Sequence, residues 1–323
     1  MRGDLDRERI RLLVGVAEMY YQDGLRQDEI ATKVGYSRAT VSRLLDEAKL
    51  RGIVRFQIGH PLEHVIRLET ELAAHFPKVR FHVGENMSPA NAVPDVGRLA
   101  AELLARELRD GQQVGISTGS TVAAVADVLP QRAAGLASDL TFVQLVGTVA
   151  AHNAMTDGPE LCRRFATAFE ADFATLPAPL VARNFASARS FREDYVIAAA
   201  LDRARNVDVA LLGIGRFHQR NATGDILYGW TEQETRRQLA AAGAVAHVLG
   251  QFLGPRGEIL NNEINRRIIG LELRELATIP RVIAVTAGTE KTRAILAALE
   301  TGLIHDLVLD FETASTVLGA ATR

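Results

Sequence analysis

The residue types best suited to binding chemistry gather in one short segment, Thr118-Gly119-Ser120-Thr121. The apolar run QVGIST predicts a strand that ends near Ser117, and the following VAAVADVL predicts a helix. Glycine lets the backbone approach an anion closely, the flanking hydroxyls can donate hydrogen bonds, and the first helical turn presents unpaired N–H groups. Because no Asp or Glu stands in that turn, the sequence favours a phosphate site here. The alternative is an ordinary strand–helix turn capped by Ser120.

A second segment with similar features is VTAGTEKTRAILAAL. Lys291 falls in the first turn of the predicted helix, where a positive charge opposes the helix dipole unless an anion lies nearby. Glu290 can supply that negative charge. The pattern therefore leaves two interpretations open for Lys291, a phosphate-binding lysine and a merely exposed one.

Other polar residues could contact the hydroxyl groups of a sugar. Gln144 and Gly147 stand at the end of the apolar run LTFVQLVG, Asp157 follows soon after it, and Asp225 lies in NATGDILYGW. We expect these four residues to face a sugar ligand.

Several familiar sites are not supported. The segment LLGIGRF has Gly213 and Gly215, but His218 stands where a G-x-G-x-x-G dinucleotide motif requires its third glycine. Cys162 is the sole cysteine, which excludes an intrachain disulfide and a thiolate metal cage, and we interpret it as a buried hydrophobic residue. The sequence predicts no cofactor, no metal site and no catalytic residue.

The elements that must position the loop at 118–121 alternate between strand and helix from about residue 79. Apolar strand cores recur along this region, with amphipathic helices between them, near 92–109 and 158–170 among others. The expected strands are KVRFHV, QVGIST, LTFVQLVG, ADFATL, DVALLGIG, HVLGQFL, RVIAVTAG and DLVLD. This alternation predicts a Rossmann-like α/β domain over 79–323 with a largely parallel sheet, and such folds bind ligands at the carboxyl ends of their strands.

The N-terminal region has a different pattern. Residues 8–22 predict a supporting helix, QDEIATKV predicts a short second helix, and Gly35 predicts the break before a third helix capped by Ser37. Two short helices joined by a glycine turn are typical of a helix-turn-helix unit. We place this winged-helix-like domain at 1–58, with IVRFQI at 53–58 as a wing or a link, and a linker helix at 59–78.

The third helix carries the residues that could read DNA. Its start, off the apolar stripe, offers guanidinium groups for guanine edges or phosphates, hydroxyls for phosphates, and a methyl group for thymine. These residues are Ser37, Arg38, Ala39, Thr40, Ser42 and Arg43. Residues 33–55 carry six Lys or Arg and two acidic residues, which fits a surface that faces phosphates. The alternative is a three-helix bundle whose polar face is only solvated.

Composition narrows the class of protein. The chain has 323 residues, 47% of them hydrophobic and 24% charged, with a net charge of −2, which suits a globular protein of one small and one large domain. No apolar run is long enough to span a bilayer, and the charged start of the chain does not resemble a signal peptide. We therefore expect a cytoplasmic protein without a membrane partner.

Taken in order, several segments resemble the SorC family of sugar-binding transcription regulators. They are SRATVSRLLDEAKLRGIV, GISTGSTVAAVADVL, FVQLVG, LPAPLVA, DVALLGIG and VTAGTEKTRAILAALETGLI, and they cover the chain from about 10 to 318. The resemblance implies a large domain similar to sugar-phosphate isomerases and deaminases, with phosphate held at 118–121 and assistance from Lys291. It also implies operator DNA as a partner, a sugar or sugar phosphate as effector, and a homo-oligomer, dimer or tetramer.

Three functions compete on these observations. The first is a regulator of a carbohydrate or polyol catabolic operon, in which the effector shifts the population of DNA-binding arrangements. The second is a sugar-phosphate isomerase or deaminase, which needs a carboxylate base; related isomerases carry Asp-Gly-Ala-Asp-Glu, whereas this chain has Thr-Asp-Gly-Pro-Glu at 156–160. Related deaminases carry His-Ile-Ala-Phe-Asn-Glu after a glycine pair, whereas this chain has RFHQRNATGD. The third, a scaffold, leaves the phosphate loop unexplained, so the sequence favours the regulator.

Overall fold

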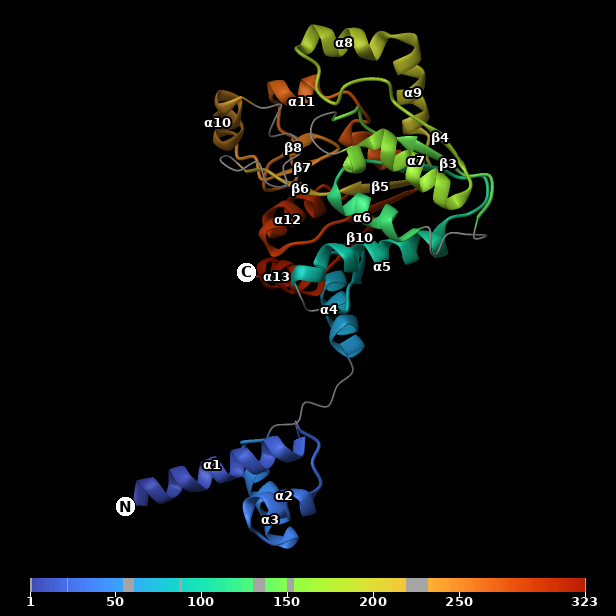
Figure 1. The fold of residues 1–323 in the computed structure, drawn as a ribbon. Coiled ribbons are helices and arrows are strands. Elements are labelled where there is room, and N and C mark those ends of the chain that lie inside the picture. Colours follow the sequence, from blue (N-terminus) through green and yellow to red (C-terminus); the bar gives the residue numbers. More distant parts are fainter. Residues whose placement is uncertain are drawn as a thin grey trace. The chain divides into compact units, whose positions relative to one another are not determined.

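The computed structural model describes residues 2–21, 23–54, 61–86, 89–129, 137–149, 154–218 and 232–322. The chain divides into two compact units, Met1–His60 and Pro61–Arg323, each with its own elements (Figure 1). We describe each unit by itself.

The smaller unit is built from three helices, α1 (Arg2–Tyr21), α2 (Gln27–Val34) and α3 (Arg38–Leu50). Their buried apolar residues form one cluster: Leu13, Val16, Ala17, Ile30, Ala31, Val41, Leu44, Leu45 and Ala48. Gly35 ends α2 with a left-handed φ of 72°, a conformation that favours glycine. Ile53 and Val54 lie outside any strand, and the rest of the expected strand at 53–58 lies outside the described residues.

The larger unit is organised around a seven-stranded sheet in which every pairing is parallel. From edge to edge its strands are β1 (Arg80–Val83), β10 (Asp306–Leu309), β9 (Arg281–Val285), β5 (Val209–Gly213), β2 (Gln113–Ile116), β3 (Thr141–Gln144) and β4 (Asp172–Ala174). From β2 the chain proceeds to β3 and β4 on one side and then returns to β5 on the other. The strand order therefore reverses between β2 and β5.

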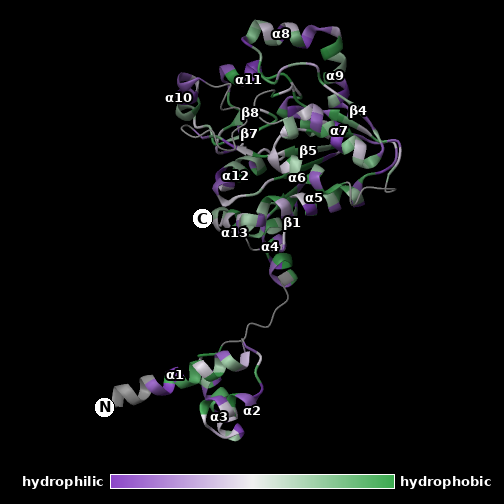
Figure 2. Cartoon of the chain, viewed as in Figure 1, coloured by the Kyte–Doolittle hydropathy of each residue, from purple (hydrophilic) through white to green (hydrophobic). Residues whose placement is uncertain are grey.

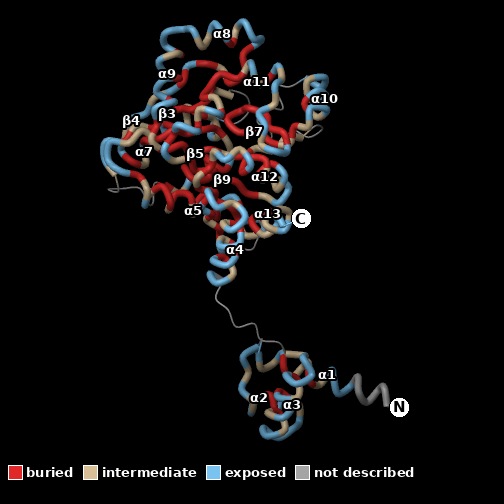
Figure 3. Tube along the Cα trace, turned by 180° about the vertical axis from the view of Figure 1, so that it is seen from behind, coloured by how far each residue is buried: buried red, intermediate tan, exposed pale blue. Residues whose placement is uncertain are grey.

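Helices cover both faces of this sheet. One apolar cluster includes Val209 and Leu211 with residues of α5 (Ala92–Glu107), α6 (Ser120–Val128) and α7 (Gly158–Phe169). The other includes Ala210 and Leu212 with residues of α4 (Pro61–His75), α12 (Thr292–Glu300) and α13 (Phe311–Ala321). Successive β5 residues enter opposite clusters, as strand geometry requires. The covering helices mix hydrophilic and hydrophobic residues (Figure 2), and β5 and β9 are buried at the centre (Figure 3).

The expected strand HVLGQFL is in fact a hairpin, so that prediction was wrong. β7 (Ala246–Val248) and β8 (Gln251–Leu253) pair antiparallel, and β6 (Gly215–Arg216) pairs antiparallel with β7. The chain reverses at Leu249 and Gly250, whose φ angles are 50° and 78°. Two consecutive positive φ values give the tight turn that suits the twist of a hairpin. The unbroken apolar run concealed this turn because Leu249 is not a residue typical of it.

Four helices had no counterpart among the named expectations: α8 (Phe185–Glu193), α9 (Tyr195–Arg205), α10 (Gln233–Ala241) and α11 (Glu263–Arg267). Short 3-10 helices lie at Pro89–Asn91, Ala154–Thr156, Leu273–Thr278 and Thr289–Lys291. The helix expected at 59–78 corresponds to α4, which belongs to the larger unit and contacts β1 and α13.

Candidate functional site

A cleft opens at the carboxyl ends of β2 and β5, where the strand order reverses. Open α/β sheets bind ligands at such a point. The cleft has an empty volume of about 490 Å³, part of which is open to solvent, and segments that follow β2, β5 and β9 contribute to its walls. Its described lining consists of Ser117, Thr118, Gly119, Ser120, Thr121, Val146, Gly213, Ile214, Gly215, His247, Leu249, Gly250 and Lys291. The structure thus brings together the loop at 118–121 and Lys291.

The backbone of the loop presents N–H groups at the start of α6. Gly119 has φ 136° and ψ 163°, a region in which only glycine is comfortable, and α6 begins at the next residue. Within the described part of the chain, the N–H groups of Ser120 and Thr121 donate to no backbone or side-chain oxygen. The first turn of α6 contains no acidic residue. The positive end of the helix dipole therefore faces the cleft without a protein carboxylate on that turn.

The three hydroxyls of the loop have different roles. Thr118 donates from Oγ1 to the carbonyl of Thr156 at 2.6 Å, and Thr121 donates from Oγ1 to the carbonyl of Val285 at 2.8 Å. The hydroxyl protons of Thr118 and Thr121 are therefore used in hydrogen bonds within the protein. Ser120 is exposed, and its hydroxyl forms no hydrogen bond with the described residues. Of the three, Ser120 is the hydroxyl placed to donate to a ligand.

Lys291 adds a positive charge to the cleft wall. Burial lowers the pKa of the Lys291 ammonium, Arg216 lowers it further, and Glu290 and Asp310 oppose the shift. A lysine held with its charge partly desolvated gains most from a bound anion, because the anion compensates for the lost hydration. Of the two interpretations open from sequence, the structure places Lys291 in the cleft.

The sequence reasoning missed the wall formed by the small sheet. Gly215 lies opposite His247 in the β6–β7 register. A Cβ on Gly215 would come within 2.0 Å of the His247 ring, so glycine at this position leaves room for the imidazole. A lone histidine in an apolar run gave no signal of its own. The available signal was the glycine pair at 213 and 215, which does not fit a dinucleotide motif but leaves room for a neighbouring side chain.

Three residues expected to face a sugar lie outside the described lining. Gln144 is buried, and its amide donates to the carbonyl of Val146 at 2.7 Å and accepts from the N–H of Leu176 at 3.0 Å. Gly147 donates its N–H to the carbonyl of Ile269. A Cβ on Gly147 would lie 2.5 Å from the backbone of the 179–180 segment.

The other two residues expected to face a sugar are aspartates. Asp157 caps α7. Asp225, the fourth, lies outside the described residues.

The described lining of the cleft contains no Asp or Glu. Cys162 is buried in a separate apolar cluster, and burial raises the pKa of its thiol to about 12, so it remains a protonated thiol at neutral pH. Within the described ranges, no group of three or more His, Cys, Asp or Glu side chains is placed to hold a metal ion.

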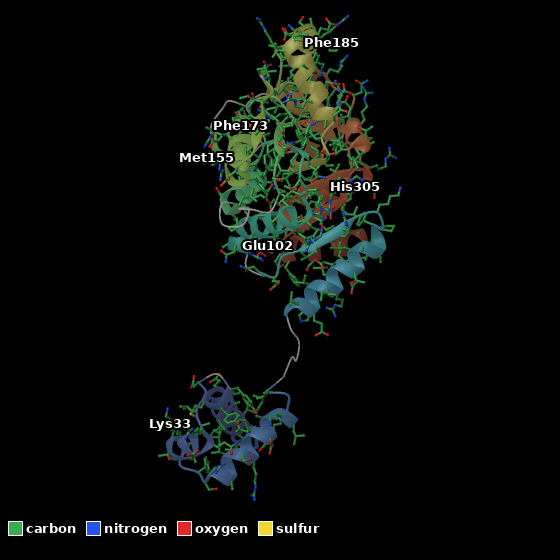
Figure 4. The ribbon with its side chains drawn as sticks, turned by 90° about the vertical axis from the view of Figure 1, so that its right-hand side faces the viewer. Lys33, Glu102, Met155, Phe173, Phe185 and His305 are labelled. Atoms are coloured by element: carbon green, nitrogen blue, oxygen red, sulfur yellow. The ribbon has the colours of Figure 1, made fainter. Side chains whose placement is uncertain are left out.

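The smaller unit presents a second candidate surface at the start of α3. Ser37 caps the helix by accepting from the N–H of Thr40 at 3.2 Å, and the two hydroxyls lie 2.8 Å apart. Arg38, Ala39 and Arg43 are exposed, whereas Thr40 and Ser42 are half-buried. The first turn of α3 has no acidic residue. On α2, Lys33 is also exposed at the surface of this unit (Figure 4).

Other charges of this unit are used internally. Arg9 of α1 pairs with Glu47 of α3 at 2.5 Å, and Arg51 pairs with the same carboxylate at 2.9 Å. By contrast, Arg38 and Arg43 form no ion pair with the described residues. They are therefore available to an external anion such as a DNA phosphate.

Comparisons with known proteins cover almost the whole chain. Residues 60–319 match the family model described as "Putative sugar-binding domain". The chain is 30% identical over 317 residues to the deoxyribonucleoside regulator of Bacillus subtilis (strain 168), and this alignment covers 97% of this chain and 99% of the relative. It is 33% identical over 306 residues to the transcriptional regulator LsrR of Escherichia coli (strain K12), and this alignment covers 94% of this chain and 93% of the relative.

A solved structure agrees with these relatives. The full-length sorbitol operon regulator SorC from Klebsiella pneumoniae superposes with a TM-score of 0.73 at 25% identity, covering 96% of this chain and 99% of that one. Among the described helices, none combines the length and apolar character needed to cross a membrane. Together with the α/β fold and the cleft at its switch point, these matches show that the chain belongs to the SorC family of sugar-binding transcriptional regulators.

Proposed function

We propose that this protein regulates transcription of a carbohydrate or polyol catabolic operon by binding a phosphorylated sugar in the cleft of its larger unit. The observation that carries this proposal is the set of groups that surround the loop at 118–121. Two amides of α6 without a protein acceptor among the described residues, the exposed hydroxyl of Ser120 and the desolvated ammonium of Lys291 all line one cleft. Such a set recognises a doubly charged oxyanion.

The sugar part of the effector extends from the loop toward the opposite wall. There His247 can exchange hydrogen bonds with hydroxyl groups, and Leu249 and Ile214 offer apolar surface to the carbon–hydrogen face of a sugar. The sugar contacts predicted for Gln144, Gly147, Asp157 and Asp225 remain predictions.

Operator DNA is the second partner in this proposal. A helix-turn-helix domain at 1–58 places the start of α3 in the major groove of the DNA. Arg38, Ala39, Ser42 and Arg43 face the DNA, and Ser37 and Thr40 fix the helix start beside a phosphate. The protein acts in the cytoplasm as a homo-oligomer, a dimer or a tetramer. The effector favours one arrangement of the subunits and thereby changes affinity for the operator, by no more than its own preference between arrangements.

In this proposal the cleft senses its ligand and does not transform it. Isomerases and deaminases of sugar phosphates need a carboxylate beside the reacting carbons, and the described lining offers none. An assay of turnover with pentose and hexosamine phosphates tests this directly. Formation of product at a rate above the uncatalysed reaction would assign the cleft to an enzyme.

The proposal is tested by a thermal-shift screen against pentose, hexose and polyol phosphates and their unphosphorylated parents. A ligand that binds only the folded state raises the melting temperature, by mass action. We expect phosphorylated compounds to raise it and their parents to have little effect. A shift of equal size with the parent sugars would contradict the anion site. Gel-shift assays with DNA upstream of the protein's own gene then test whether the same compounds alter operator binding, which a scaffold protein would not show.

A further inference from the structure

One carbonyl oxygen, that of Thr156, accepts hydrogen bonds that hold the loop at 118–121 in place. The carbonyl of Thr156 accepts two hydrogen bonds from the loop, one from the Thr118 hydroxyl at 2.6 Å and one from the Gly119 N–H at 3.0 Å. Thr156 ends the 3-10 helix Ala154–Thr156, which contacts both α6 and α7. Met155, in the middle of this turn, lies at the surface of the larger unit (Figure 4). The orientation of a single peptide group thus determines where two loop residues lie.

That peptide group is itself fixed by the next residue, Asp157. The Asp157 side chain caps α7, and its Oδ1 accepts from the N–H of Gly158 at 2.9 Å and from the N–H of Val149 at 3.0 Å. Its own N–H donates to the carbonyl of Ala154 at 3.1 Å and closes the 3-10 turn. One carboxylate oxygen therefore joins the segment after β3 to the start of α7, immediately beside the carbonyl that receives the loop.

The loop needs this support because glycine does not fix its own backbone conformation. Gly119 has a φ of 136° and a ψ of 163°, which glycine adopts without strain but leaves as easily, so its surroundings must hold it there. A Cβ built on Gly119 would meet nothing within 4 Å, so packing against the residue does not hold it. The two hydrogen bonds to Thr156 do. They also set the direction of the following amides, at Ser120 and Thr121.

We propose that Asp157 is a positioning residue for the effector's anionic group: it fixes the Thr156 carbonyl, which holds Thr118 and Gly119 and so aligns the amides of Ser120 and Thr121. This inference rests on the proposed anion site. According to this inference, Asp157 acts through the hydrogen bonds that its Oδ1 accepts, and its negative charge is not required to position the loop. A neutral side chain with an oxygen at the same place performs the same task.

The chain offers a matched control for this idea. Asp194 caps α9 by accepting from the N–H groups of Val196 and Ile197, and it does not adjoin a residue that bonds to the loop at 118–121. Like Asp157, it is a helix-capping aspartate whose Oδ1 accepts from two backbone N–H groups, so alanine at either position removes hydrogen bonds at a helix start. Asp157→Ala, Asp157→Asn and Asp194→Ala are made in the full-length protein, and each is titrated with inorganic phosphate by calorimetry. Thermal denaturation of each variant measures the cost to the fold.

We expect Asp157→Ala and Asp194→Ala to lower the melting temperature by similar amounts, but only Asp157→Ala to weaken phosphate binding, by about tenfold. Asp157→Asn keeps the acceptor oxygen and removes a negative charge near the site, so it should bind phosphate at least as tightly as the wild type. Equal phosphate affinity in Asp157→Ala and Asp194→Ala would overturn the inference. So would an Asp157→Asn variant as weak as Asp157→Ala.

Two further outcomes remain decisive. If Asp157→Ala does not fold, Asp157→Ser replaces it, because serine caps a helix but its hydroxyl does not also reach Val149. Asp157→Ser should fold and bind phosphate more weakly than the wild type. Wild-type affinity in that variant would overturn the inference. A wild-type protein that binds no phosphate would overturn the proposed anion site itself, and the role of Asp157 with it. The two failures are therefore distinguishable.

Discussion

At the scale of single residues, the proposed anion site depends on backbone groups more than on side chains. Thr118 and Thr121 donate their hydroxyl protons to main-chain carbonyls, so the groups that remain for a ligand are amides, the Ser120 hydroxyl and Lys291. Backbone amides cannot be removed by mutation. Their alignment can be changed through Gly119, and the charge can be changed through Lys291.

Gly119→Ala should weaken phosphate binding by about tenfold or more, because alanine is strained at a φ of 136° and the loop would relax. The added methyl group meets no atom within 4 Å, so a steric clash does not account for the effect. Gly111 is a suitable control, with a φ of 76°, equally open space around its Cβ and a position outside the cleft lining. Calorimetry of both variants checks this; equal losses in phosphate affinity would show that general destabilisation is responsible.

The lowered pKa of Lys291 gives phosphate binding a dependence on pH. Below that pKa the ammonium is charged and attracts the anion; as the pH rises through it, the charge and its contribution are lost. Phosphate itself is doubly charged well above its second pKa, so at alkaline pH its affinity should fall as Lys291 loses its proton, and the fall should begin at a lower pH than an ordinary lysine would give. Lys291→Arg keeps its charge throughout this range and should show a flatter profile. Parallel profiles for the two proteins would remove Lys291 from the site.

Sequence alone predicted the loop at 118–121 because its chemistry is local: hydroxyls, a glycine and a helix start adjoin in the chain. The sugar contacts of Gln144 and Gly147 remain predictions; in the structure the Gln144 side-chain amide and the Gly147 backbone N–H are hydrogen-bonded to main-chain groups. His247 could not be found, since it reaches the cleft only through the pairing of β6 with β7. Contacts between distant segments leave no local pattern.

At the scale of elements, alternating apolar strands and amphipathic helices were sufficient to predict the parallel sheet. A continuous apolar run fits a strand buried on both faces, and β5 has that environment. The same rule failed for 246–253, where a turn at Leu249 and Gly250 interrupts an apolar run. Helices α8 to α11 were not named. Among them, α8 and α10 bury one residue each and are mostly polar, so their sequences lack the apolar content that marked the other helices.

Helix α3 makes a separate prediction about DNA. Arg43→Ala should weaken operator binding by about tenfold and, if Arg43 pairs with a phosphate, reduce the slope of affinity against salt by about one. Arg11 is an exposed arginine on α1 and serves as the control, since Arg11→Ala changes net charge equally without touching α3. Fluorescence anisotropy over a series of salt concentrations measures both quantities. Equal effects of the two variants would argue against α3 as the docking face, and Arg43→Ala should bind phosphate as the wild type does.

At the scale of the whole molecule, two compact units divide the proposed work, one meeting DNA and the other meeting the effector. A fold of this kind controls DNA binding only if the effector prefers one arrangement of the assembled protein over another. Coupling is reciprocal, so operator DNA must change the effector's affinity by the same factor. The family model describes residues 60–319 as a sugar-binding domain, and the proposed anion site at 118–121 adds a phosphate group to the sugar.

The most direct test is therefore operator affinity measured with and without a panel of pentose and hexose phosphates, in the wild type and in Ser120→Asp. Aspartate at the first residue of α6 places a negative charge at the proposed phosphate site, and it interacts favourably with the helix dipole there, so the fold should be retained. We predict that at least one sugar phosphate changes the wild-type affinity for DNA and that Ser120→Asp binds the operator but ignores that compound. A Ser120→Asp protein that responds as the wild type does would contradict the account.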